Sequence, residues 1–283
     1  MTNAARLFLL TAITMVAFAS NSLLNRAALA DGQAGPAAFA ALRVLSGALC
    51  LAALAIWRSG LPAMATRARV VGTASLTVYM LGFSFAYIAL DAGSGALILF
   101  GGVQITMFGG ALIMGERPAP ARWVGSIVAL AGLAWLLSPG EVTPPPLGAA
   151  SLMLAAAVGW GVYSLVGRGA RDPLAETAGN FLCAAPIALI FWAIATDGIT
   201  TSGAVLAVVS GAITSGLGYA LWYAVLPRLD ASVAALAQLT APVIAIAGGA
   251  LFLAEVPEIR LILASVVVLG GVAFGVIAGR KRT

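Results

Sequence analysis

Residues 109–118 read GGALIMGERP, and residues 248–257 read GGALFLAEVP. Both stretches contain a Gly-Gly pair followed by a Glu-x-Pro turn, and they lie 139 residues apart. The same offset relates Leu90-Asp91 to Leu229-Asp230 and Gly132 to Gly271. Several matches at one fixed offset are the signature of an internal repeat. The sequence therefore predicts two halves that share one fold.

The composition around these stretches requires a membrane. Of 283 residues, 61% are hydrophobic, and only 15 Lys or Arg and 10 Asp or Glu carry a charge. A soluble domain devotes about a quarter of its residues to charge, so this chain cannot cover a water-facing surface. The positive excess is scattered in short loops, which excludes a nucleic-acid-binding face. Long apolar runs also argue against a membrane barrel, whose strands alternate apolar and polar residues.

Apolar runs bounded by charge, Pro or Gly predict ten transmembrane helices. They cover residues 7–29, 35–57, 69–90, 92–114, 120–138, 147–167, 174–196, 203–226, 231–254 and 259–279. With a cytoplasmic N-terminus, twelve Lys or Arg residues fall on the cytoplasmic side and two on the other. This positive-inside bias predicts that both termini are cytoplasmic. The alternative, a cleavable signal sequence at residues 6–19, would remove the first helix and break the repeat.

Each half contains five predicted spans, an odd number, so the second half must lie upside down in the membrane relative to the first. Residues 1–140 are predicted to form the first repeat and residues 141–283 the second. The charges support this inversion, because Arg117 and Arg122 near the first Glu-x-Pro turn are replaced by Val256 and Leu261 near the second. Inverted repeats around a midplane site recur in secondary transporters.

This organisation resembles the drug/metabolite transporter (DMT) superfamily, specifically its EamA-type exporters. The resemblance is carried by the five-plus-five repeat, the Gly-rich helices and the turns Gly-Glu-Arg-Pro (115–118) and Ala-Glu-Val-Pro (254–257). Trp160-Gly161 is similar to the first-helix signature of the family, whereas the first half departs from it with Phe18-Ala19. Within the superfamily the chain resembles the aromatic amino acid exporters of the YddG group. The resemblance implies export of amino acids and related metabolites across the bacterial inner membrane.

No enzyme constellation is present in the sequence. The chain has no His, and no loop combines a nucleophile with a base, so neither catalytic nor metal-ligating residues nor a cofactor are predicted. Cys50 and Cys183 lie in apolar segments and are expected to be small core residues. Pairs such as Gly125/Ala129 and Gly271/Gly275 have the spacing that lets membrane helices approach closely.

Aromatic and polar side chains near the middle of the spans are the candidate binding residues. Tyr79, Phe83 and Tyr87 recur every four residues and therefore share one helix face. The candidate substrate-binding set is Asn21, Ser22, Arg43, Tyr79, Phe83, Phe100, Gln104, Trp160, Tyr163, Tyr219, Trp222, Tyr223, Gln238 and Thr240. Packing or hydrogen bonding between helices is the alternative explanation for each of them.

Arg43 is the one charge well inside a predicted span, where it either faces the bundle interior or extends to the membrane surface. No Asp or Glu lies at comparable depth, so the usual carrier for proton coupling is missing. Pro186 and Pro242 lie inside spans and are predicted to act as hinges during gating.

The sequence thus predicts an exporter of neutral or zwitterionic metabolites, above all aromatic and other hydrophobic amino acids, that works by alternating access around a midplane cavity. Its expected partners are a small-molecule substrate and the lipid bilayer, without nucleic acid, and its expected state is a monomer or homodimer. Two alternatives stay open. One is a flippase for lipids or lipid-linked metabolites, and the other is a membrane scaffold that transports nothing.

Overall fold

The structure, a computed structural model, describes residues 3–60, 67–115, 117–139, 144–167, 170–229 and 237–279. Its helical elements are α1 (Asn3–Ala30), α2 (Pro36–Ser59), α3 (Arg67–Ala86), α4 (Ala92–Ile113), α5 (Pro120–Leu137), α6 (Leu147–Gly167), α7 (Pro173–Ala195), α8 (Thr201–Val208), η1 (Val209–Leu217), α9 (Gly218–Val225), η2 (Leu226–Arg228), α11 (Thr240–Phe252) and α12 (Ile259–Ala278). Within these ranges, nine helical segments are long and apolar enough to cross a membrane, and α11 is a shorter apolar helix. The predicted all-helical, polytopic membrane fold is confirmed.

Most predicted spans coincide with one helix each, and α8, η1 and α9 together form the eighth, Thr201–Val225. The ninth differs, because only its residues from 237 onward are described and α11 begins at Thr240. Other features of the sequence lie outside the described residues, namely Glu116, the boundary between the repeats at 140/141, Asp230 and the basic residues at 280–282.

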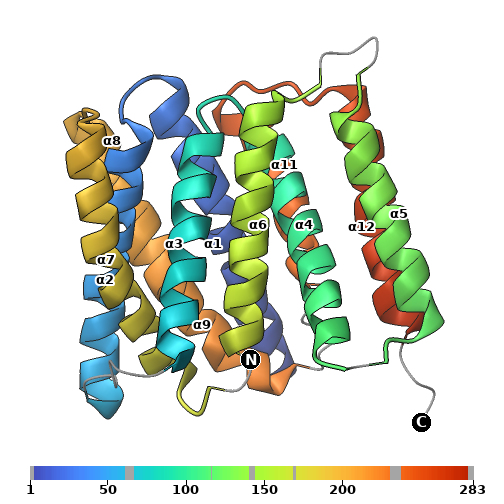
Figure 1. The fold of residues 1–283 in the computed structure, drawn as a ribbon, viewed down its shortest axis with the longest axis horizontal. Coiled ribbons are helices and arrows are strands. Elements are labelled where there is room, and N and C mark those ends of the chain that lie inside the picture. Colours follow the sequence, from blue (N-terminus) through green and yellow to red (C-terminus); the bar gives the residue numbers. More distant parts are fainter. Residues whose placement is uncertain are drawn as a thin grey trace.

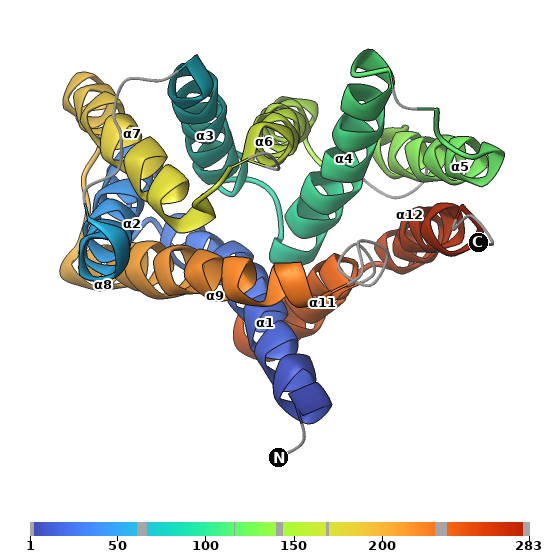
Figure 2. The ribbon, with the colours of Figure 1, turned by 90° about the horizontal axis from the view of Figure 1, so that it is seen from below.

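The helices are arranged in two layers (Figure 2). One layer contains α3, α4, α5, α6 and α7, and the other contains α1, α2, α8–α9, α11 and α12. Helices that are five spans apart in the sequence pack against each other, namely α2 with α7, α4 with α11, and α5 with α12. Each helix of one layer is therefore the predicted repeat counterpart of a helix in the other. This is the arrangement that an inverted repeat produces.

Small residues allow α5 and α12 to pack closely at one edge of the molecule (Figure 1). Gly125 and Gly271 face each other across this contact. A methyl group added at Gly271 would lie 2.9 Å from the Gly125 carbonyl oxygen, so neither position has room for a side chain. The predicted role of these glycines in close helix approach is confirmed.

Helix α1 begins and helix α12 ends at the same end of the bundle, the lower end in Figure 1. We call this the terminal end and the other the distal end. At the distal end, both carboxylate oxygens of Asp197 accept hydrogen bonds from the first backbone N–H groups of α2, with distances of 2.8 Å to Ala37 and 2.9 Å to Ala38. The Gly35 N–H also donates to the Gly198 carbonyl oxygen at 2.7 Å. The two halves are thus joined at the distal end.

Two local features of the helices differ from the predictions. The eighth span contains a nine-residue π-helix, η1, which the apolar pattern did not predict. Pro242 does not kink a continuous helix, because the helix is interrupted at Leu239 and Pro242 lies in the first turn of α11, where N–H groups have no partner within the helix. Pro186 lies inside α7 as predicted, with its side chain exposed. Their role as hinges stays a prediction.

Candidate functional site

A cavity of about 300 Å³ lies between α4, α6, α9 and the α5–α12 pair. Five of the predicted binding residues line it, namely Gln104, Trp160, Trp222, Tyr223 and Gln238. These residues come from both halves of the chain. The volume is at the lower end of the range for small-molecule sites, which run from about 300 to 1,000 Å³.

The cavity opens toward the terminal end. Its lining includes Gly167 at the end of α6, Leu226 just after α9, and Arg122 near the start of α5. The Arg122 side chain is exposed, which places the rim of the cavity there. The contacts of Asp197 join the halves at the opposite end, where a smaller pocket of about 240 Å³ lies between the start of α4, the turn after α11 and the start of α12.

The walls combine aromatic rings with a few neutral polar groups. Gln104 and Gln238 contribute amides, Tyr223 a hydroxyl, and Ser126 and Ser164 two more. The Ser164 hydroxyl donates to the Trp160 carbonyl oxygen at 2.7 Å, which satisfies its donor within α6. Among the described lining residues, only Arg122 at the rim carries a charge.

Trp160 lines the cavity, and other aromatic rings pack against it. Its centroid lies 5.4 Å from that of Tyr163 in a stacked arrangement, and 5.0 Å from those of Tyr79 and Tyr219. Phe18 packs edge-on against Trp160, Tyr219 and Trp222. A layer of aromatic rings thus backs the cavity lining, and Phe18 takes part in this layer although it stands where the resemblance predicts a Trp.

Arg43 lies behind this layer and is fully buried, at 0% exposure. Its Nε donates to the Ser215 hydroxyl at 3.2 Å, and its Nη2 donates to the Tyr79 hydroxyl at 3.1 Å. Its guanidinium carbon lies 4.8 Å from the centroid of Phe83. Of the two orientations that the sequence left open, Arg43 adopts the one that faces the bundle interior.

Asn21 is the centre of a hydrogen-bond cluster that the sequence only partly predicted. Its Oδ1 accepts from Thr214 at 2.6 Å, Ser210 at 2.9 Å and Ser215 at 3.2 Å. These three hydroxyls all lie on η1, and π-helical segments often occur at functional sites. Sequence reasoning missed them, although a run of Ser, Thr and Gly inside an apolar span was a usable signal.

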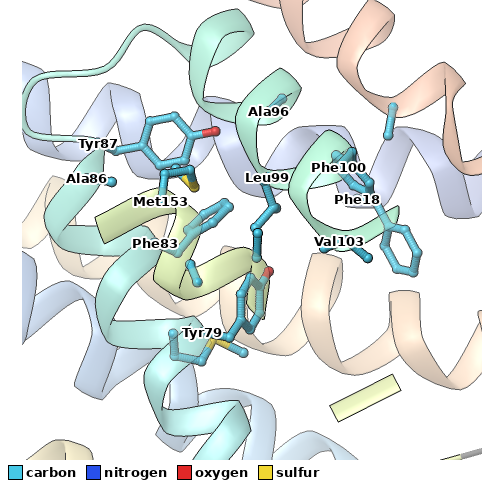
Figure 3. Packing of buried hydrophobic residues seen from close by; sticks show 14 of the residues in the cluster. Phe18, Tyr79, Phe83, Ala86, Tyr87, Ala96, Leu99, Phe100, Val103 and Met153 are labelled. Carbon is cyan, nitrogen blue, oxygen red and sulfur yellow. The ribbon is translucent and has the colours of Figure 1, made fainter. Parts of the chain in front are cut away.

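Other predicted residues are distributed between the aromatic layer and its surroundings. Figure 3 shows Tyr79, Phe83 and Tyr87 in a row along α3 and the turn that follows it, as the four-residue spacing predicted. Ser22 and Phe100 are buried. The Tyr163 hydroxyl donates to Thr177 at 3.2 Å, on the α7 side of α6. Thr240 is exposed and bonds to the Ala237 carbonyl oxygen, so the structure does not bring it to the cavity.

Arg69 has a structural environment that sequence reasoning missed. It is the first residue of the predicted span 69–90, and its side chain is buried, with Nη2 2.7 Å from Glu176 Oε2. Its Nη1 also donates to Asn180 Oδ1 at 3.0 Å. The sequence signal that could have indicated a partner for Arg69 was Glu176, the acidic residue in the first turn of α7. This ion pair connects α3 of the first half to α7 of the second.

Comparisons with known proteins agree with this geometry. Residues 147–277 match the EamA-like transporter family. An uncharacterized protein of Pseudomonas aeruginosa is 48% identical over 270 residues, which cover 95% of this chain and 93% of that protein. A solved crystal structure with 22% sequence identity has a TM-score of 0.72 and covers 98% of this chain and 99% of its own. At that identity the likeness shows the fold alone.

Proposed function

Because the chain belongs to the EamA-like transporter family, within the DMT superfamily, we propose that it exports small neutral or zwitterionic metabolites, above all aromatic and other hydrophobic amino acids. The cavity at the terminal end is the observation that carries this proposal. It joins aromatic rings and two amides from both halves of a multi-pass membrane protein. Residues 1–140 and 141–283 act in this proposal as the two inverted repeats.

The lining of the cavity favours this substrate class. The faces of Trp160 and Trp222 offer apolar surface to a hydrophobic side chain. The amides of Gln104 and Gln238 can donate to a carboxylate and accept from an ammonium group. A polyanion would need several cations, whereas Arg122 is the one cation among the described lining residues.

The conformation supports export by alternating access. We place the terminal end in the cytoplasm on the strength of the positive-inside bias, so the cavity would receive its substrate from the cytoplasm. The distal end, held by Asp197 on the first turn of α2, would then open to the other side of the bacterial inner membrane. The two layers of counterpart helices can exchange conformations because their folds are similar.

The test is transport by purified protein in proteoliposomes. Labelled L-tryptophan, L-phenylalanine and L-aspartate are supplied with and without a pH gradient and a membrane potential. We expect saturable uptake of both aromatic amino acids and little uptake of L-aspartate. A parallel assay measures translocation of a fluorescent phospholipid. Lipid movement without amino acid movement would favour a flippase, and movement of neither would favour a scaffold.

A further inference from the structure

Arg43 on α2 carries a buried positive charge that no carboxylate of the described residues neutralises. Its described partners, the hydroxyls of Ser215 and Tyr79, are neutral, and its Nη1 donates to no group of the described chain. The ion pairs found within the described ranges are Arg26–Asp91, Arg26–Glu255 and Arg69–Glu176. None of these carboxylates bonds to Arg43, although Arg43 is more completely buried than Arg26 or Arg69.

A guanidinium group stays protonated inside a protein, and a buried charge is costly unless a partner neutralises it. The rings of Tyr79 and Phe83, 5.5 and 4.8 Å from the guanidinium carbon, offset part of this cost through their π faces. They supply no acceptor for Nη1. The planar fork of N–H donors matches the two oxygens of a carboxylate, which would supply both the missing charge and the missing acceptor.

Arg43 lies one aromatic ring behind the cavity wall. Trp160 lines the cavity, and its centroid is 5.0 Å from that of Tyr79. The Tyr79 hydroxyl in turn holds Nη2 of Arg43 at 3.1 Å. Moving Trp160 and Tyr79 aside would therefore expose the guanidinium directly to the cavity. Ser215, the other partner of Arg43, lies on the π-helix η1, whose hydrogen bonding departs from that of an α-helix.

We propose that Arg43 binds the carboxylate of the transported substrate at the stage of the cycle when Trp160, which lines the cavity, and Tyr79, which packs behind it, move aside. Nη1 and Nη2 then donate to the two carboxylate oxygens, and the hydrogen bond from Nη2 to the Tyr79 hydroxyl is broken. This inference rests on the proposed function and narrows its substrate class. The substrate must carry a carboxylate beside an apolar or aromatic body, and amines that lack a carboxylate are poor substrates.

The test compares three probes that share one ring system. These are L-tryptophan, indole-3-propionate, which lacks the ammonium group, and tryptamine, which lacks the carboxylate. In proteoliposomes we expect wild-type protein to transport the two carboxylates at least tenfold faster than tryptamine. Arg43→Gln should lower the transport rates of L-tryptophan and indole-3-propionate at least tenfold and leave the rate of tryptamine transport unchanged. Arg43→Lys should be intermediate, because a single ammonium group cannot reproduce the paired donors.

Arg69→Gln is the matched control, because it also removes a buried arginine, but one that is paired with Glu176. We expect it to change the rates of all three probes by the same factor, through the amount of folded protein. If folded Arg43→Gln protein transports L-tryptophan at the wild-type rate, or loses all three rates equally, the inference is overturned and the proposed function stands. If Arg43→Gln does not fold, the ratio of L-tryptophan to tryptamine transport in Arg43→Lys decides in the same way.

A binding measurement separates this inference from the proposed function. Indole-3-propionate should raise the melting temperature of the wild-type protein in detergent by about 2–4 °C and leave that of Arg43→Gln unchanged. Tryptamine should shift neither. If the wild type transports none of the probes, the proposed function fails, and the melting temperatures still decide the inference. An equal shift in both proteins, or none in the wild type, would overturn it.

Discussion

Arg26 on α1 and Glu255, in the turn after α11, form an ion pair with 2.8 Å between Nε and Oε1. The second carboxylate oxygen of Glu255 accepts from the Ala92 N–H, the first of α4, at 2.8 Å. Arg26 also reaches Asp91 at 3.3 Å. The Glu of the second Glu-x-Pro turn therefore links the two halves at the distal end, rather than ending a helix in solvent.

We expect Glu255→Gln to weaken this link between the halves. The amide can still accept from the Ala92 N–H, but the ion pair is lost, at a cost of about 1 kcal/mol for a partly buried pair. Openings of the distal end should then be roughly fivefold more frequent. The measurement is the rate at which a membrane-impermeant maleimide labels a cysteine at the buried position Ala96, with Cys50 and Cys183 replaced by Ala. Glu258→Gln, in the same turn and exposed, is the control, and an equal rate in both variants would contradict the prediction.

Truncating the amides of the cavity should slow transport. Gln104→Ala and Gln238→Ala each remove a hydrogen bond to a charged group of the proposed substrate, worth about 1.5–3 kcal/mol, or more than tenfold in apparent affinity. Trp160→Ala should have at least as large an effect, because it removes the wall itself. Ser151→Ala, on the exposed face of α6, should leave uptake of labelled L-tryptophan unchanged. Normal uptake by all three cavity variants would disprove the site.

The contact between α5 and α12 should depend on one of two adjacent glycines. Gly271→Ala places a methyl group 2.9 Å from the Gly125 carbonyl oxygen, so the helices must separate, at a cost of about 1–3 kcal/mol. Gly270→Ala meets nothing within 4 Å and should leave stability unchanged or raise it slightly. The free energy of unfolding in mixed detergent micelles measures both. Equal effects of the two substitutions would mean that close packing is not what the glycine provides.

The orientation in the membrane can be tested with single cysteines in a background without Cys50 and Cys183. The cysteine of Ser202→Cys, at a position exposed at the distal end, should react with a membrane-impermeant reagent added to whole cells. The cysteine of Arg171→Cys, at a position exposed at the terminal end, should react only after the inner membrane is permeabilised. The opposite pattern would invert the assignment of the cavity to the cytoplasm and, with it, the direction of transport.

The sequence by itself determined the membrane class, most helix positions and the repeat. These depend on properties of single segments, since about 20 apolar residues are needed to span a bilayer and a repeat is visible as a fixed offset. The sequence also determined that Tyr79, Phe83 and Tyr87 share a face, because helical spacing fixes that relation before any packing occurs. Gln104, Trp160 and Gln238 were among its candidates for the cavity that the structure describes.

Only the tertiary structure decided which side chains face the cavity. Lipid and protein interior are both apolar, so polarity does not mark the inward face of a membrane helix as it does in a soluble protein. In α4, Ile113 is 89% exposed and Leu97 is fully buried, and their types do not distinguish them. The rotation and pairing of the helices place Thr240 outside the cavity and gather Ser210, Thr214 and Ser215 around Asn21. The same packing buries Arg43 with no carboxylate of the described residues bonded to it, and no single segment of the sequence contains that fact.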